Sequence, residues 1–411
     1  MNKAFIVDAV RTPIGRYAGA LKDIRPDDLL AIVLRSLVER TGLPPSEIED
    51  VIAGCSNQSG EDGRNVARTA LLVAGFPPTV GGVTVNRLCG SGLEAVRLAF
   101  QTIASGEGNI IVAAGVESAT RAPFIMPKPE VAFPRGELRL FDTTGGWRQV
   151  NPVLAEKYPP FSLGETAENV AEQKRVAREV QDAYALESHL KAARAIKDGS
   201  FSDEIVPVEV RGPRGTAIRI EIDEHVNPGM TLDRLQGLRP AFRHGGTVTT
   251  GNSAAMGDGA SAVLLTSAAA AERLGLQPMA SVVASAVAGI DPAIMGLGIV
   301  PAARKAMQRA GVSPADIDLV ELDEAFAAQA LPAIREIGVA YDRVNVNGGS
   351  IALGHAVGST GCRLVVTLVH EMHRRGARYG LAAMAVGMGQ GLAVVLENAS
   401  GSVTTASPAD A

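Results

Sequence analysis

One sequence pattern occurs twice in this chain, in segments that begin 269 residues apart at Gly42 and Gly311. The first copy reads G-L-P-P-S-E-I-E-D-V-I (Gly42–Ile52), and the second reads G-V-S-P-A-D-I-D-L-V-E (Gly311–Glu321). Each copy follows a stretch with helical apolar spacing and predicts a helix stop, a turn and a strand. A repeat of this kind indicates a duplicated α/β unit. We therefore predict two related halves around a pseudo-two-fold axis, with the functional site where their loops meet.

A second, weaker similarity between two segments supports the duplication. Cys89-Gly-Ser-Gly, a helix and a strand over 109–114 resemble the segment 354–361, a helix over 362–374 and a strand over 381–386. Alternating strands and helices predict an α/β fold with mainly parallel sheets under helices. Between the halves, proline-rich sequence over 121–250 predicts an inserted loop domain that acts as a lid.

Composition excludes several classes of protein. The 411 residues are 46% hydrophobic and 20% charged, and the net charge of −5 predicts no nucleic-acid partner. No apolar run is long enough to span a membrane. The three dispersed cysteines, Cys55, Cys89 and Cys362, form no disulfide framework, and the first strand, at 4–7, follows no signal-like segment. We expect a cytoplasmic protein with a frayed tail over 398–411.

Cys89 lies in the most conspicuous turn of the chain, V-N-R-L-C-G-S-G-L-E-A-V-R-L-A (Val85–Ala99). An apolar entry, small residues and helical spacing predict strand, tight turn and helix. At a helix N-terminus a thiol ionises more easily, and the thiolate is the nucleophile. The alternative is a small buried side chain without a chemical role.

Three further segments contain residues suited to acyl transfer. His355 lies between glycines in N-V-N-G-G-S-I-A-L-G-H-A-V-G-S-T-G, although a single histidine can also be structural. Asp323 and Glu324 end a predicted strand, and Ala383–Leu392 offers a glycine-rich loop with free N–H groups. A thiolate, a proton-handling histidine and N–H groups for an oxyanion are the parts of thioester chemistry.

Two rival interpretations are weaker. Gly90–Ala95 matches a dinucleotide fingerprint, but the next predicted strand ends in glycine rather than an acidic residue. His370 and His373 lack metalloprotease spacing, so we predict a surface helix there and no metal site.

Several motifs together resemble the thiolase family of acyl-CoA:acetyl-CoA C-acyltransferases over residues 2–397. Segments Gly54–Arg68 and Asp142–Arg148 resemble its β-ketoadipyl-CoA branch most. The shared motifs are V-R-T-P-I-G, N-R-L-C-G-S-G, G-E-T-A-E-N-V-A, T-G-N, D-E-A-F and N-G-G-S-I-A-L-G-H.

The resemblance implies a thiolase fold with two βαβαβαββ halves, layered sheets and helices, and a homodimer or homotetramer. The implied N-terminal half is 1–120 plus 251–275, the inserted loop domain is 121–250, and the C-terminal half is 276–397.

The resemblance also assigns roles to residues. Cys89 would take the acyl group, His355 would activate it, and Gly387 with the N–H of Cys89 would bind the oxyanion. Coenzyme A and acyl-CoA are substrates rather than permanently bound cofactors. The positions implied to contact CoA are Ser253, Ala254, Leu163, Asn227 and Arg234.

Five positions depart from the family pattern. Ala385 stands where the family has a second cysteine that moves the α-carbon proton, and Asp323 stands where it commonly has asparagine. Ala356 replaces a proline, and two expected CoA contacts are changed at Ala254 and Asn227. Loss of a general acid/base costs about 10²–10⁴-fold in rate, so Claisen condensation and thiolysis should be impaired. Either Ala385 disables an ordinary thiolase, or Cys89 serves acyl exchange, hydrolysis or another condensation. A non-catalytic CoA-binding protein is a third interpretation.

Overall fold

The computed structural model describes residues 2–399. The N-terminal half contains the following elements: β1 (Ala4–Arg11), β2 (Gly15–Arg16), α1 (Pro26–Thr41), η1 (Pro45–Glu47), β3 (Asp50–Gly54), α2 (Val66–Val73), β4 (Gly81–Val85), α3 (Ser91–Ser105), β5 (Ile110–Ser118), β10 (Gly257–Ser267) and α8 (Ala268–Leu274). The C-terminal half contains β11 (Ala280–Gly289), η3 (Pro292–Gly298), α9 (Ile299–Ala310), η4 (Pro314–Asp316), β12 (Leu319–Leu322), α10 (Ala327–Ile337), η5 (Tyr341–Arg343), α11 (Ser350–Leu353), α12 (Val357–Arg375), β13 (Tyr379–Val386) and β14 (Gln390–Asn398).

Within the described residues the strands of both halves form one ten-stranded sheet in the order β12-β13-β14-β11-β1-β10-β5-β3-β4, with β2 beside β10. The prediction of mainly parallel sheets is wrong. Three strand pairs are parallel and six are antiparallel. The connection between β13 and β14 spans only residues 387–389, and so short a connection permits only antiparallel pairing.

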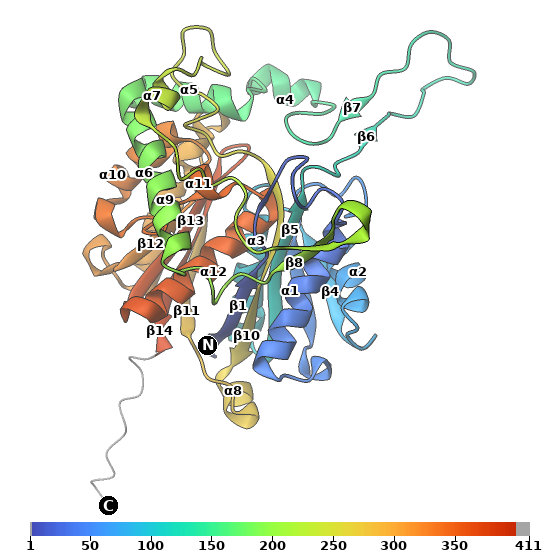
Figure 1. The fold of residues 1–411 in the computed structure, drawn as a ribbon, viewed down its shortest axis with the longest axis vertical. Coiled ribbons are helices and arrows are strands. Elements are labelled where there is room, and N and C mark those ends of the chain that lie inside the picture. Colours follow the sequence, from blue (N-terminus) through green and yellow to red (C-terminus); the bar gives the residue numbers. More distant parts are fainter. Residues whose placement is uncertain (1, 400–411) are drawn as a thin grey trace, which may run out of the picture.

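Helices α3 and α12 form a central layer between the two halves of the sheet (Figure 1). Their inward faces share one apolar core with both halves of the sheet. Helices α1 and α2 cover the outer face of the N-terminal half, and α9 and α10 cover that of the C-terminal half. Because α12 is central, His370 is buried and its Nε2 lies 2.8 Å from the carbonyl oxygen of Ala9. The prediction of a surface helix is therefore wrong for His370, whereas His373 is exposed.

The repeat appears in the backbone as predicted. Gly42 ends α1 and Gly311 ends α9, both with positive φ, where glycine has no Cβ penalty. A short 3₁₀ turn and then a strand follow each glycine. The two copies lead to β3 and β12, which both pair in parallel with the next strand of their half.

The inserted segment lies partly above the sheet and sends out the long β6–β7 arm (Figure 1). Its elements are β6 (Phe124–Ile125), β7 (Phe141–Asp142), α4 (Pro152–Lys157), α5 (Leu163–Lys174), α6 (Arg178–Lys197), β8 (Val208–Arg211), η2 (Pro213–Gly215), β9 (Ala217–Ile220) and α7 (Leu232–Gln236).

The last strand, β14, continues through the buried Asn398, so this first residue of the predicted tail belongs to the sheet. Residues 400–411 of that predicted tail lie outside the described residues. Among helices within 2–399, none is long and apolar enough to cross a membrane.

Candidate active site

Cys89 lies in a tight turn directly before α3. Leu88 has a φ of 50°, and the Ser91 hydroxyl accepts from the N–H of Arg87 at 2.9 Å and donates to the Leu88 carbonyl at 2.6 Å. A Cβ on Gly90 would lie 2.7 Å from Cγ2 of Val386, so glycine lets this turn pack against the end of β13. Cys89 is partly exposed, whereas Cys55 and Cys362 are buried.

The surroundings of Cys89 disfavour its ionisation. Burial raises the pKa of the Cys89 thiol to about 12, and the charge of Asp323 raises it further. Hydrogen bonds from the backbone N–H groups of Gly387 and of Cys89 itself oppose this shift in pKa. The prediction of an easily ionised thiol is therefore wrong, because burial and a nearby carboxylate outweigh the helix N-terminus. A base must remove the thiol proton.

His355 is held by backbone pairing with residues 255–257. Its N–H donates to the carbonyl of Ala255 at 2.9 Å, and its own carbonyl accepts from the N–H of Gly257 at 3.1 Å. The Nδ1 atom of His355 lies 2.8 Å from the Thr360 hydroxyl, which donates its proton to the Ala356 carbonyl at 3.0 Å. Burial lowers the pKa of His355, so the ring is neutral near pH 7. A neutral ring that donates from Nδ1 leaves Nε2 as a proton acceptor.

Asp323 follows β12 and is 2% exposed. Its N–H donates to the carbonyl of Ala383 at 3.0 Å, which fixes it beside β13. Its Oδ1 accepts from the Ser350 hydroxyl at 2.8 Å and lies 3.8 Å from Nδ1 of His355. Its Oδ2 is buried and has no hydrogen-bond partner within residues 2–399.

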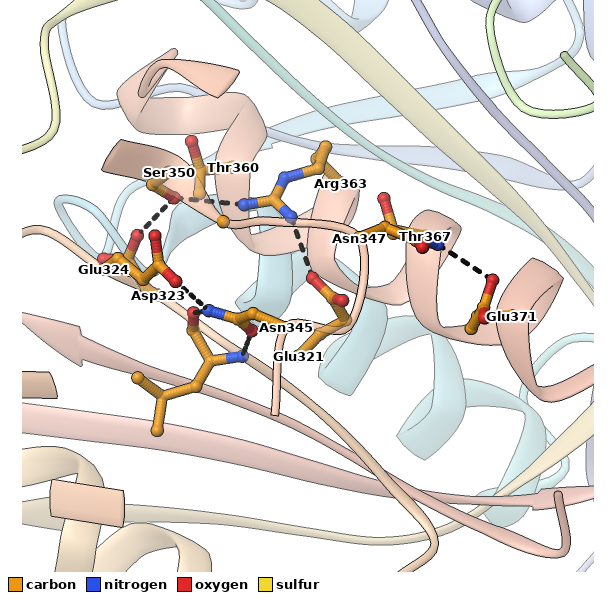
Figure 2. Close-up of polar contacts among 12 residues, drawn as sticks. Glu321, Asp323, Glu324, Asn345, Asn347, Ser350, Thr360, Arg363, Thr367 and Glu371 are labelled. Carbon is orange, nitrogen blue, oxygen red and sulfur yellow. Dashed lines mark hydrogen bonds and ion pairs between the residues drawn. The ribbon is translucent and has the colours of Figure 1, made fainter. Parts of the chain in front are cut away.

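A buried polar network of Ser350, Arg363 and Glu321 holds the Asp323 carboxylate in place (Figure 2). The Ser350 oxygen accepts from the Arg363 guanidinium at 3.0 Å, and Arg363 also donates to Glu321 at 3.0 Å. Burial raises the pKa of Glu321 to about 8 despite the charge of Arg363.

Glu324 has a different role from its neighbour. Its two oxygens accept from Tyr184, Ser188 and Asn345, which ties α6 to the loop after β12. With these partners Glu324 holds the structure together. Of the two acidic residues that follow β12, only Asp323 has a side-chain oxygen without a hydrogen bond to another described residue.

Ala385 lies in an apolar cluster with Val248, Met295 and Phe326 and is 4% exposed. No group at this position exchanges a proton. Met388, in the loop after β13, and Gln390, at the start of β14, are not acids or bases either.

The positions predicted to contact CoA lie in three separate parts of the chain. Ser253 and Ala254 lie beside the site, since the N–H of Ala254 donates to the carbonyl of Ala325 at 2.9 Å. Asn227 and Arg234 share one turn, where both bond to Gly229. Leu163 is separate from both groups in sequence, at the start of α5, and is exposed.

Cys55, Asp62 and Glu117 bring one possible metal-ligand atom each within 4.8 Å of one another. Both oxygens of Glu117 already accept hydrogen bonds from the loop at 56–57 and from Gly358. This cluster therefore serves to join that loop to α12.

Sequence reasoning missed Thr360, Ser350 and Arg363. The available signal was modest: Arg363 shares one helix face with the polar residues Thr367 and Glu371, and Thr360 is in the first turn of the helix that follows His355.

Known proteins match this chain over nearly its full length. The model described as "Thiolase, N-terminal domain" matches residues 4–269, and "Thiolase, C-terminal domain" matches 276–398. The Escherichia coli K12 protein named 3-oxoadipyl-CoA/3-oxo-5,6-dehydrosuberyl-CoA thiolase is 51% identical over 400 residues, with 97% of this chain and 100% of that protein covered. The beta-ketoadipyl-CoA thiolase of Pseudomonas aeruginosa is 51% identical over 399 residues, with 96% and 99% covered.

Solved structures agree with these matches. The acetyl-CoA acetyltransferase of Bacillus anthracis superposes with a TM-score of 0.89 at 41% identity, covering 97% of this chain and 99% of that one. Human mitochondrial 3-ketoacyl-CoA thiolase gives 0.90 at 37% identity with the same coverage. The chain therefore belongs to the thiolase family of acyltransferases and has its fold.

Proposed function

We propose that this protein transfers acyl groups between CoA thioesters through a covalent intermediate on Cys89. Nε2 of neutral His355 takes the thiol proton, and the sulfur attacks the thioester carbonyl. The N–H groups of Cys89 and Gly387 stabilise the oxyanion, and the leaving CoA thiolate takes the proton back from His355. The observation that carries this proposal is that Cys89 is a partly exposed residue whose sulfur accepts from the Gly387 N–H.

Ala385 limits the second part of a thiolase reaction. When a 3-oxoacyl chain is cleaved, the acetyl-CoA carbanion must gain a proton, and condensation requires its removal. The residues clustered around Ala385 are apolar and offer no proton donor or acceptor. This supports rates of thiolysis and condensation that are lower by about 10²–10⁴-fold. The first half-reaction, acylation of Cys89, needs no group at this position.

The substrate class we propose is a 3-oxoacyl-CoA of the 3-oxoadipyl type, because the two bacterial relatives carry that substrate in their names. We propose CoA contacts at Ser253, Ala254, Leu163, Asn227 and Arg234. We also propose a cytoplasmic homodimer or homotetramer, with 121–250 as the inserted domain between the halves 1–120 plus 251–275 and 276–397.

Intact mass measurement tests the acylation. After incubation with acetyl-CoA or a 3-oxoacyl-CoA, we expect one acyl adduct that disappears in Cys89→Ser. The buried cysteines offer matched controls, because Cys55→Ser and Cys362→Ser should keep the adduct. Absence of an adduct with every acyl donor would contradict the proposal and favour a non-catalytic CoA-binding protein.

A further inference from the structure

The Oδ2 oxygen of Asp323 is a buried acceptor at the site without a hydrogen bond from the described residues. Asp323 is 2% exposed, and this oxygen has no donor within residues 2–399. Leaving a buried carboxylate oxygen without a hydrogen bond is costly, so such an atom points to a donor that arrives with a ligand. Its partner oxygen lies 3.8 Å from Nδ1 of His355, so Asp323 lies beside the ring that we propose takes the thiol proton.

The network behind Asp323 keeps this carboxylate oriented. Ser350 donates its only hydroxyl proton to Oδ1 and accepts from Arg363, which is 1% exposed. The positive charge of Arg363 polarises the Ser350 hydroxyl and strengthens its hydrogen bond to Oδ1. Oδ2 is left as the free acceptor. The negative charge of Asp323 raises the pKa of Cys89 and opposes the lowering of the His355 pKa by burial, as expected if Asp323 lies close to each.

We infer that Asp323 is a general base that activates water, so that the protein hydrolyses the acyl–Cys89 thioester and acts as an acyl-CoA hydrolase. This inference rests on the proposed acylation of Cys89. Oδ2 takes a proton from the water while the water oxygen bonds to the acyl carbon. The carbon–sulfur bond then breaks, the Cys89 sulfur leaves with the bonding pair, and it receives the proton from Asp323. The products are the free carboxylic acid and the Cys89 thiol.

Hydrolysis suits this site for a second reason. It needs no proton transfer at the α-carbon, so the apolar surroundings of Ala385 do not oppose it. A carboxylate close to a developing oxyanion is unfavourable, and it is useful only if it accepts a proton in the same step.

Decay of a preformed acyl-enzyme tests the inference. The protein is loaded with acetyl-CoA, freed of CoA by gel filtration and followed by intact mass in buffer. We expect the wild-type adduct to decay, and Asp323→Asn, which keeps the side-chain shape, to load but to decay about 10²–10⁴-fold more slowly. Asp342→Asn removes the same charge at an exposed position and should decay at the wild-type rate.

Water labelled with ¹⁸O adds a direct readout, because hydrolysis must place the label in released acetate. A solvent deuterium isotope effect on decay should be present in the wild type and lost in Asp323→Asn. A stable wild-type adduct, or equal decay in Asp323→Asn, overturns the hydrolase inference alone. Failure of the wild type to load overturns the proposed acylation and the inference together.

Discussion

Nδ1 of His355 lies 2.8 Å from the hydroxyl oxygen of Thr360, in the first turn of the next helix. Since Thr360 gives its own proton to the Ala356 carbonyl, it can only accept from the ring. One buried hydroxyl thus selects the histidine tautomer that leaves Nε2 free for the thiol proton.

Replacing Thr360 by valine should slow acylation of Cys89. The change leaves Nδ1–H buried without an acceptor, at a cost of about 1–3 kcal/mol, which corresponds to roughly 5- to 160-fold in rate. Stopped-flow acylation with acetyl-CoA measures the effect as a function of pH. Thr360→Ser keeps the hydroxyl and should restore most of the rate; equal loss in both variants would argue against a hydrogen-bonding role.

Ala385→Cys should raise thiolysis of a 3-oxoacyl-CoA by about 10²–10⁴-fold, because it supplies a group that can protonate the acetyl carbanion. The rate is followed as acetyl-CoA release in the presence of CoA. Ala385→Ser is the size-matched control, since its hydroxyl is a much weaker acid. No gain in Ala385→Cys, with acylation of Cys89 intact, would favour a reaction without α-carbon proton transfer.

Gly358→Ala should destabilise the protein by about 1–3 kcal/mol or more, as overpacking of a dense core does. An added Cβ would overlap the Val116 carbonyl and lie 2.9 Å from Cα of Cys55, so the start of α12 would shift. Urea unfolding measures the loss. Gly289→Ala, whose nearest neighbour would be 3.8 Å away, should cost far less.

His189 should make stability depend on pH. Burial lowers the pKa of His189 to about 4, while an unfolded histidine titrates near pH 6.5. Below about pH 6.5 the unfolded chain binds a proton that the folded protein does not bind until about pH 4. The unfolding free energy therefore falls as pH falls through this window, by about 3 kcal/mol from this group.

Urea unfolding at pH 7 and pH 4.5 tests this dependence. His189→Asn keeps an acceptor for the Asn227 N–H, which bonds Nδ1 at 3.3 Å, and should lose less stability on acidification than the wild type. His244→Asn, at an exposed position, should follow the wild type. An unchanged pH dependence in His189→Asn would contradict the assignment.

The sequence by itself determined the duplicated halves and the chemical types at the site. Gly42 and Gly311 end equivalent helices because a left-handed cap suits glycine, and that preference is local. Cys89, His355 and the loop at Gly387 were also identified from sequence, because small residues around each of them form short, recognisable patterns.

Only the tertiary structure decided the directions of the paired strands, the protonation state of Cys89 and the hydrogen bonds that hold Asp323. Antiparallel pairing of β10 with β1 and β5 joins segments far apart in the chain. The raised pKa of Cys89 comes from burial and from Asp323, which lies on the other half of the molecule. The hydroxyl of Ser350 and the guanidinium of Arg363 reach Asp323 only through the packing of α11 and α12. Such effects depend on distances through space in a low-dielectric interior, and local sequence patterns do not encode those distances.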